Sequence, residues 1–288
     1  MYPCRSAAKS IIATALFLTL ATWVVAQPPS SSPEPTPSAP VTGPVEVARI
    51  SLVAGNAEVR RQNGPWMKAA EEQPLSMGDR IRTLEGTTVR LEFPWTVVAM
   101  SDNTEVSLPK SRLLTLQLEK GRIDVDPELA LLRIATSEAT IGGEGRTLVR
   151  RQGAITFVGS YNGGANVKSS TSLVRLGVGK GTIVNAGAPP SEPVHLAEPP
   201  KVVSPGSDPP YVRPGQIVHL SWTGRETTYH LEVLPIDSDV PVVSLDLSAT
   251  SYDLRLTWLG TFRWRVAGRS GAVETVPSGE GLICVVEK

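Results

Sequence analysis

The segment from Leu75 to Val89 (LSMGDRIRTLEGTTV) constrains the fold of this chain more than any other feature. It contains a turn at Gly78-Asp79, where glycine can adopt a positive φ and the aspartate side chain can bond to the nearby backbone. A second turn at Glu85-Gly86 follows, and apolar residues then alternate with charged ones from Val89 to Phe93. A two-residue period is typical of a half-buried β-strand, so the segment predicts short strands joined by tight turns.

Similar short strand patterns recur along the middle of the chain, separated by glycine-rich breaks. Apolar residues occupy alternate positions from Leu114 to Leu118, and further short strands are expected around Ile134, Phe157 and Val174. No segment has the sustained 3.6-residue period of an amphipathic helix, and a short helix is considered only at residues 127–132. The pattern predicts an all-β fold, with a wound β-roll or solenoid-like stack of sheets in this part.

A longer pattern of small, apolar and turn residues surrounds the first motif. Its positions are Gly55, Ala57, Val59, Trp66, Ala69, Ala70, Leu75, Gly78-Asp79, Ile81-Arg82-Thr83, Val89, Leu91 and Thr104. In order and spacing this pattern resembles the FecR domain family of extracytoplasmic bacterial proteins. The resemblance implies a receptor, adaptor or envelope-binding module, and no active site accompanies it.

The last part of the chain has a different strand pattern. Apolar and polar residues alternate from Val218 to Trp222, from Tyr229 to Val233 and again from Phe262 to Val266. A tryptophan on an early strand and an aromatic-x-Trp-x-Val strand near the end resemble the core of a fibronectin type III or related immunoglobulin-like domain. The resemblance implies a C-terminal β-sandwich that buries these apolar side chains.

Two proline-rich segments and an N-terminal apolar run divide the chain. Residues 1–26 are expected to be a cleaved secretory signal peptide, because Arg5 and Lys9 precede an apolar core that ends in small residues. The further division is a proline-rich linker at 27–46, a FecR-like domain at 47–187, a second proline-rich linker at 188–205 and a sandwich at 206–288. We therefore expect a bacterial protein that is periplasmic, secreted or on the cell surface, with no membrane span after signal cleavage.

Charge and cysteine content narrow the function classes. The chain has 28 basic and 28 acidic residues, and removal of residues 1–26 takes away two basic ones, which leaves a net charge of 26 minus 28, or −2. A nucleic-acid binder needs a basic excess, so nucleic acid is not an expected partner. Cys284 is the only cysteine after residue 26. It shares a parity with Leu282 and Val286 and is expected to be a buried, reduced thiol.

Several short motifs resemble catalytic or metal-binding motifs, but the neighbouring residues that such sites need are missing. Ser107 to Lys110 has an S-x-x-K spacing, but Pro109 opposes the helix that this motif needs. Asp124 and Asp126 lack the glycine and the distal glutamate of a calcium loop. The two histidines His219 and His230 are expected on solvated strand faces without further metal ligands. We therefore predict a non-enzymatic protein with no metal and no cofactor.

The candidate ligand surface consists of Arg255, Arg263 and Arg265, which are expected on one outward face of the sandwich, where arginines can grip a carboxylate or an anionic glycan. The favoured function is binding or scaffolding in the envelope, with a cell-wall polymer or an envelope protein as partner. Two alternatives remain open. One is a periplasmic signalling accessory to a membrane receptor, and the other is a hydrolase with an unrecognised site, which buried carboxylates in a cleft would favour.

Overall fold

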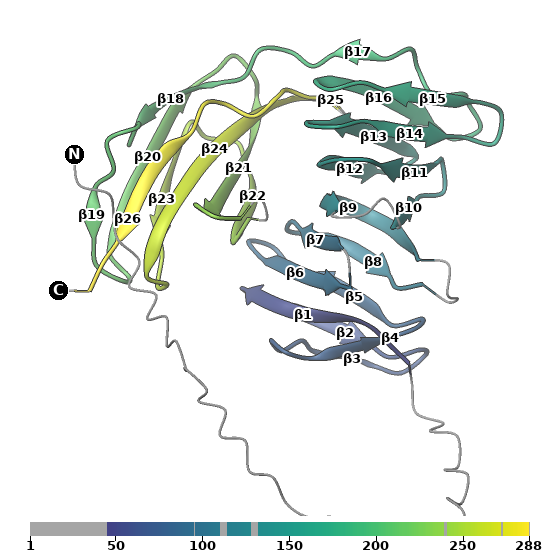
Figure 1. Ribbon diagram of the computed structural model, residues 1–288, viewed down its shortest axis with the longest axis horizontal. Coiled ribbons are helices and arrows are strands. Elements are labelled where there is room, and N and C mark those ends of the chain that lie inside the picture. Colours follow the sequence, from purple (N-terminus) through teal and green to yellow (C-terminus); the bar gives the residue numbers. More distant parts are fainter. Residues whose placement is uncertain are drawn as a thin grey trace, which may run out of the picture. The chain divides into compact units, whose positions relative to one another are not determined.

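The computed structural model describes residues 45–94, 96–109, 114–127, 132–238, 241–271 and 273–287, and these belong to one compact unit. The expected signal peptide, most of the first linker and the centre of the helix considered at 127–132 lie outside the described residues. Every regular element within these ranges is a β-strand, so the all-β prediction is confirmed (Figure 1). The described residues include no helix with the length and hydropathy of a membrane span.

Strands β1 to β17, here called the roll, wind between two hydrogen-bonded ladders that share the long strand β9 (Thr115–Pro127). The first ladder runs in the order β4 (Pro74–Ser76), β1 (Glu46–Ala54), β6 (Thr88–Phe93), β7 (Thr96–Met100), β9, β12 (Thr147–Gln152), β13 (Ile155–Ser160), β16 (Lys180–Asn185) and β17 (Val194–His195). The second runs in the order β3 (Trp66–Lys68), β2 (Ala57–Arg60), β5 (Arg80–Thr83), β8 (Glu105–Ser107), β9, β10 (Arg133–Ala135), β11 (Thr140–Gly143), β14 (Ala165–Lys168) and β15 (Leu173–Leu176).

One apolar cluster joins the buried side chains of both ladders. Leu91 and Ile123 from the first ladder and Ile81 and Leu118 from the second are fully buried in it. The predicted Gly78-Asp79 turn is present: Gly78 has a φ of 78° and the Asp79 carboxylate accepts a hydrogen bond from the Ser76 amide at 2.9 Å. The alternation seen in the sequence therefore does set which face of these strands enters the core of the roll.

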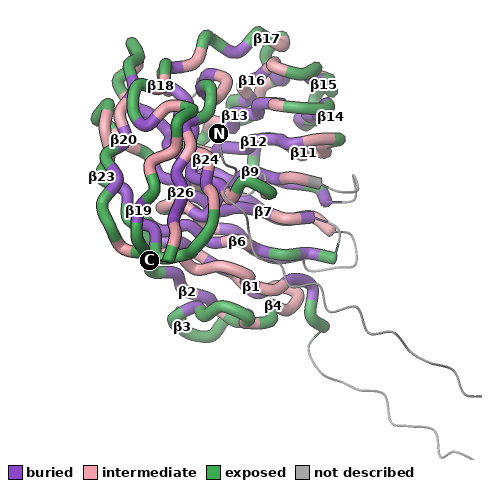
Figure 2. Tube along the Cα trace, turned by 60° about the vertical axis from the view of Figure 1, so that its left-hand side comes forward, coloured by how far each residue is buried: buried purple, intermediate pink, exposed green. Residues whose placement is uncertain are grey.

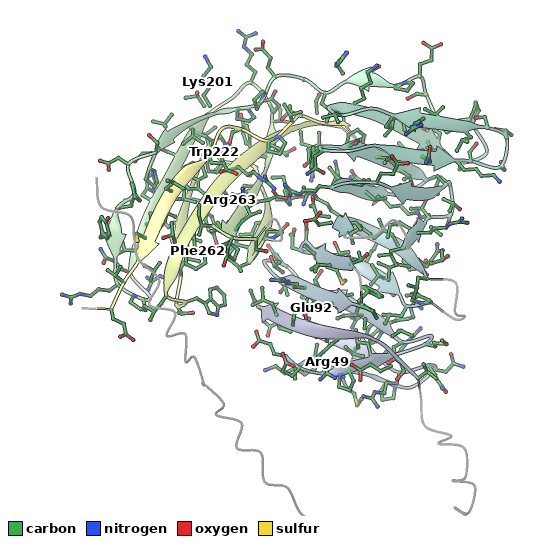
Figure 3. All side chains as sticks on the ribbon, viewed as in Figure 1. Arg49, Glu92, Lys201, Trp222, Phe262 and Arg263 are labelled. Atoms are coloured by element: carbon green, nitrogen blue, oxygen red, sulfur yellow. The ribbon has the colours of Figure 1, made fainter. Side chains whose placement is uncertain are left out.

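Strands β18 to β26 form the C-terminal sandwich. One sheet contains β18 (Lys201–Ser204), β20 (Ile217–Thr223) and β23 (Ser251–Arg255), and the other runs β19 (Tyr211–Val212), β26 (Gly281–Val285), β24 (Gly260–Ser270), β21 (Thr228–Pro235) and β22 (Val243–Leu247), with β25 (Val273–Glu274) on β24. Trp222 and Phe262 lie among these strands (Figure 3). The Trp222 ring is 5.7 Å from the ring of Tyr229 and 6.2 Å from that of Trp264, so the expected aromatic core is present.

Two expectations differ in detail from the structure. The segment 188–205 was expected to be a linker, yet it contributes β17 to the roll and β18 to the sandwich. Cys284 is fully buried, as expected, but the described residues contain no free cysteine, which corrects the expected reduced thiol. On β26 it alternates with Ile283 and Val285, which belong to the sandwich core, so its side chain lies on the opposite face of the sheet, beside Thr261; this corrects the expectation that it faces that core.

The sheet of the sandwich that contains β21 and β24 is buried on both of its faces. All six residues from Tyr229 to Leu234 are buried, and so are those from Trp264 to Gly268. Figure 2 shows in purple where buried residues lie along the chain. One face of this sheet is the apolar core of the sandwich. The other is polar, and it lies against the first ladder of the roll, where Ser244 bonds to Thr88 and Ser101.

Candidate functional site

Strands of the roll place charged side chains on the face of the first ladder that points away from the roll core. On β9, Arg122 and Asp124 alternate with Ile123 and Val125, which are buried in the core. The period of two puts the arginine and the aspartate on the same face. Arg150 on β12 stands directly opposite Arg122 in the antiparallel register.

Strands of the sandwich place charged side chains on the surface that meets this face. Glu232 on β21 has the opposite parity to Leu231 and Val233, which fill the sandwich core. Arg265 on β24 is the register partner of Glu232. The same alternation that builds each core therefore brings two polar faces together.

These side chains form a buried ionic network, here called the junction cluster, that consists of Arg122, Asp124, Arg146, Glu232, Glu274 and Arg265. Arg122 contacts the carboxylates of Asp124 at 2.5 Å, Glu274 at 3.1 Å and Glu232 at 3.2 Å. Arg146 donates to Glu232 at 2.8 Å and to Asp124 at 3.1 Å. The Arg265 Nε donates to Glu232 at 2.8 Å. Glu232 is thus shared by all three guanidinium groups.

Three positive and three negative charges balance within the junction cluster. The relative exposure is 4% for the Asp124 side chain, 3% for that of Glu232 and 0% for that of Glu274. Taking ions out of water is costly, so such a network adds little net stability compared with an apolar interface. Removing one partner is different, because it leaves another charge buried without compensation. The cluster therefore fixes how the two parts fit together.

A second layer of hydrogen bonds surrounds the cluster. The His230 Nε2 lies 3.0 Å from the Ser244 hydroxyl, and its Nδ1 lies 2.8 Å from the Asp246 carboxylate. The Ser244 hydroxyl is also 2.7 Å from that of Ser101 in the roll. The Tyr161 hydroxyl donates to Glu274 at 3.1 Å. His230 is fully buried, which corrects the expectation that it is solvated; His219 is exposed and pairs with Asp253.

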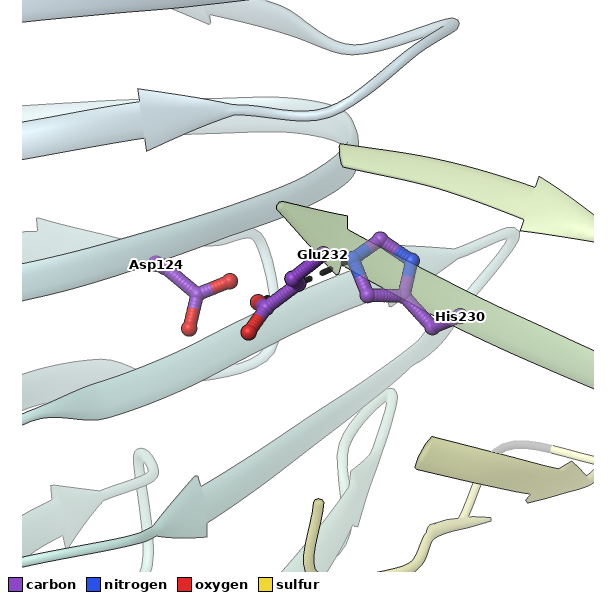
Figure 4. Close-up of side chains that lie close together, drawn as sticks. All are labelled: Asp124, His230 and Glu232. Carbon is purple, nitrogen blue, oxygen red and sulfur yellow. Dashed lines mark ion pairs between the residues drawn. The ribbon is translucent and has the colours of Figure 1, made fainter. Parts of the chain in front are cut away.

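Three side chains in this region have the residue types of a metal site. Atoms of Asp124, His230 and Glu232 lie within 4.8 Å of one another, and the groups point toward each other (Figure 4). The carboxylates, however, already face the guanidinium groups of Arg122 and Arg146. A cation would have to displace or oppose these fixed positive charges, so the donor set suits an ion-pair network and not a metal ion.

The charges of the nearby arginines also shift the pKa values of the carboxyl groups in this region. Burial alone raises the pKa of Glu232, but the charges of Arg146 and Arg122 outweigh it and hold that pKa well below its ordinary range. For Asp246 burial again opposes ionisation, and the hydrogen bond from His230 and the charge of Arg269 lower the pKa. Asp124 shifts the other way, because burial and the Glu232 charge raise its pKa.

We expect acid to destabilise the protein through Glu232 and Asp246. Their pKa values are lower in the folded state, so the stability they contribute is complete above the unfolded values of about 4 and is lost as the pH falls below them. Urea unfolding between about pH 5 and pH 2 should show a declining free energy of unfolding. The Glu232→Gln variant should show a shallower decline. An equal slope in both proteins would contradict the assignment to Glu232.

The structure separates the three arginines of the expected ligand surface. Arg255 is exposed on β23, in the three-stranded sheet, whereas Arg263 and Arg265 lie on β24 in the other sheet. Arg265 is only 9% exposed and pairs with Glu232. Arg263 pairs with Glu280 at 3.0 Å. The expectation that the three arginines share one outward face is therefore wrong, because the roll covers the polar side of β24 at Arg265.

A pocket of about 320 Å³ opens where strands of the roll meet the sandwich. It is here called the seam pocket. Its lining includes Asp102 and Lys120 from the roll, Asp246 from β22 and Arg269 from β24. Arg122, Arg150 and Arg151 complete its charged lining, so five basic side chains face two acidic ones. The lining of the seam pocket therefore carries an excess of positive charge.

Comparisons with known proteins give no family. No protein-family model matches the chain, and no curated protein matches it. Among solved structures it is similar to a candidate anti-sigma factor from Parabacteroides distasonis, with 19% identity over 40% of this chain and a TM-score of 0.35. The matched region spans 57% of the length of that protein.

Two further structures cover more of the chain at lower similarity. The FN1–FN3 domains of chicken CNTN1 match 85% of this chain and 96% of that one, with 12% identity and a TM-score of 0.26. SGBP-B of Bacteroides ovatus, solved with a mixed-linkage heptasaccharide, matches 83% of this chain and 60% of that one, with 10% identity and a TM-score of 0.19. Likenesses of this size name neither a family nor a ligand, so the FecR resemblance stays a prediction.

Proposed function

We propose that this is a non-enzymatic binding or scaffolding protein of the bacterial envelope, secreted to the periplasm or cell surface, with a FecR-like roll and a fibronectin-like sandwich. The observation that supports a non-enzymatic role best is the pairing within the junction cluster. Its carboxylates are the acid–base groups that a hydrolase would need, yet each faces a guanidinium group and is almost fully buried. A catalytic carboxylate must instead reach the substrate.

The proposed partner is a cell-wall polymer or an envelope protein. The expected secretory signal and the proline-rich arm that follows it support a tethered or secreted protein outside the cytoplasm. The junction cluster supports a rigid arrangement of roll and sandwich, which suits a protein that presents one fixed surface. A signalling accessory that presents the roll to a membrane receptor would use the same surface and is the alternative within this class.

A hydrolase is the second candidate, because three buried carboxylates do gather at one place. Burial and the Glu232 charge raise the pKa of Asp124, which is the direction that a general acid requires. The arginine contacts and the lack of exposure argue against it. Turnover that Asp124→Asn abolished while folding was retained would establish the hydrolase.

The test is co-sedimentation of the mature protein with purified, insoluble cell wall and, separately, with washed envelope fragments. We expect saturable binding to one of these and no release of soluble wall fragments. Soluble products from the wall would overturn the non-enzymatic role. Absence of saturable binding to both preparations would overturn the envelope-binding role.

A further inference from the structure

The charge balance of the seam pocket is set by which of its basic residues already have acidic partners. Arg122 is neutralised inside the junction cluster, Arg151 pairs with Glu138 at 2.9 Å, and Arg269 pairs with Asp246. Among the described residues, neither Lys120 nor Arg150 has a carboxylate within 4.0 Å. These two cations of the pocket therefore have no direct ion-pair partner among the described residues.

Arg150 is the more informative of the two, because it is only 6% exposed. Its guanidinium donates to the Gly271 carbonyl at 3.2 Å and to the Gln152 side chain at 2.5 Å, both of which are neutral. Burial and the charge of Arg269 lower the Arg150 pKa to about 10, and the more distant charges of Asp246 and Glu274 offset only part of this shift. A buried arginine is ordinarily paired with a carboxylate or a phosphate. Here the space in front of it is a pocket.

The acidic residues of the pocket do not fill this role. Asp246 is engaged by His230 and Arg269. Asp102 accepts a hydrogen bond from Asn103 at 3.0 Å, and burial together with the Asp246 charge raises its pKa. Neither aspartate forms an ion pair with Arg150, so its guanidinium group can take an anionic ligand as partner.

We propose that the seam pocket binds one oxyanion, a carboxylate or phosphate carried by a group about the size of a single sugar, with Arg150 as its main contact and Lys120 at the rim. Planar guanidinium groups bind either oxyanion through two parallel hydrogen bonds. The volume of about 320 Å³ is at the lower end for ligand pockets, which limits the bound group to one unit of a polymer. The inference rests on the proposed function and gives the chemistry of its ligand.

The experiment is titration calorimetry of the full mature protein with three probes: galacturonic acid, glycerol phosphate and neutral galactose. We expect saturable binding of at least one acidic probe, weakened by added salt because screening reduces the attraction. The first two probes decide between a carboxylate and a phosphate source. Binding of neither acid, or equal binding of galactose, would overturn the proposal.

Variants assign the binding to the pocket. Arg150→Gln should weaken it at least about tenfold, since a hydrogen-bonded charge is lost, and Arg150→Lys should restore part of the affinity. Lys120→Ala should weaken it about threefold, while the exposed Lys168→Ala on β14 serves as the control and should change nothing. Equal affinity in wild type and Arg150→Gln would overturn the assignment.

The Asp102→Asn variant is expected to bind the anion more tightly, a result that misfolding could not produce. It removes a negative charge from the pocket lining, so anion binding should become about two- to fivefold tighter. Weaker or unchanged binding would count against an oxyanion in this pocket. If the Arg150 and Asp102 variants left co-sedimentation with cell wall intact while the acidic probes failed to bind, the envelope-binding function would stand and the pocket proposal would fall.

Discussion

Glu232→Gln is expected to lower the free energy of unfolding of the sandwich by about 3–5 kcal/mol, because it removes one charge from a buried ionic network. Glu232 accepts from Arg122, Arg146 and Arg265, so its loss leaves an excess of positive charge with almost no access to water. Urea unfolding followed by tryptophan fluorescence would measure the change. The matched control is Glu144→Gln, whose partner Arg175 is 73% exposed. There the change should stay within about 1 kcal/mol.

A double-mutant cycle with Arg265 tests the same network from the other side. Arg265→Gln alone also unbalances the cluster, but in the double variant one positive and one negative charge leave together. The two losses should therefore be far from additive, with a coupling of about 1–3 kcal/mol. Additive losses would mean that the 2.8 Å contact between the two side chains carries no energy, and the junction cluster would lose its assigned role.

Strand alternation explains why both cores were predictable from the amino-acid sequence. Val218, Leu220 and Trp222 are all buried as their spacing implies, and the same holds for Phe262 and Trp264. A period of two requires only local information, since each strand places every second side chain on one face. The β-class and the winding of the roll followed from this period and from glycine-rich turns. The order of strands within the two ladders did not.

The junction cluster was missed because alternation identifies a polar face without showing what covers it. His230 and Glu232 have the spacing of solvated residues on an outer strand, yet both are buried. The Glu232 partners Arg122 and Arg146 lie 110 and 86 positions away in the sequence, and no local pattern links them to Glu232. Glu274 lies on the two-residue strand β25, which has no period at all. A single sequence holds no signal for such a long-range pairing of charges.

Trp222→Ala is expected to unfold the sandwich and leave the roll folded. Trp222 is 2% exposed and packs against Tyr229 and Trp264, and truncation of a core tryptophan costs about 3–5 kcal/mol. The roll has an apolar cluster of its own, and this cluster shares no buried residue with the sandwich core. Its face toward the sandwich is polar at Arg122 and Asp124, so water can solvate that face once the sandwich opens.

Hydrogen exchange followed by mass spectrometry would separate the two parts. In Trp222→Ala, amides of β20, β21 and β24 should lose protection, whereas those of β6, β9 and β13 should keep most of theirs. A matched change in the roll, Leu91→Ala, should act on the other set, because Leu91 is fully buried between the ladders. If Trp222→Ala removed protection from both sets at once, roll and sandwich would be a single cooperative unit. The boundary between residues 187 and 206 would then mark a change of sheet and not a division between domains.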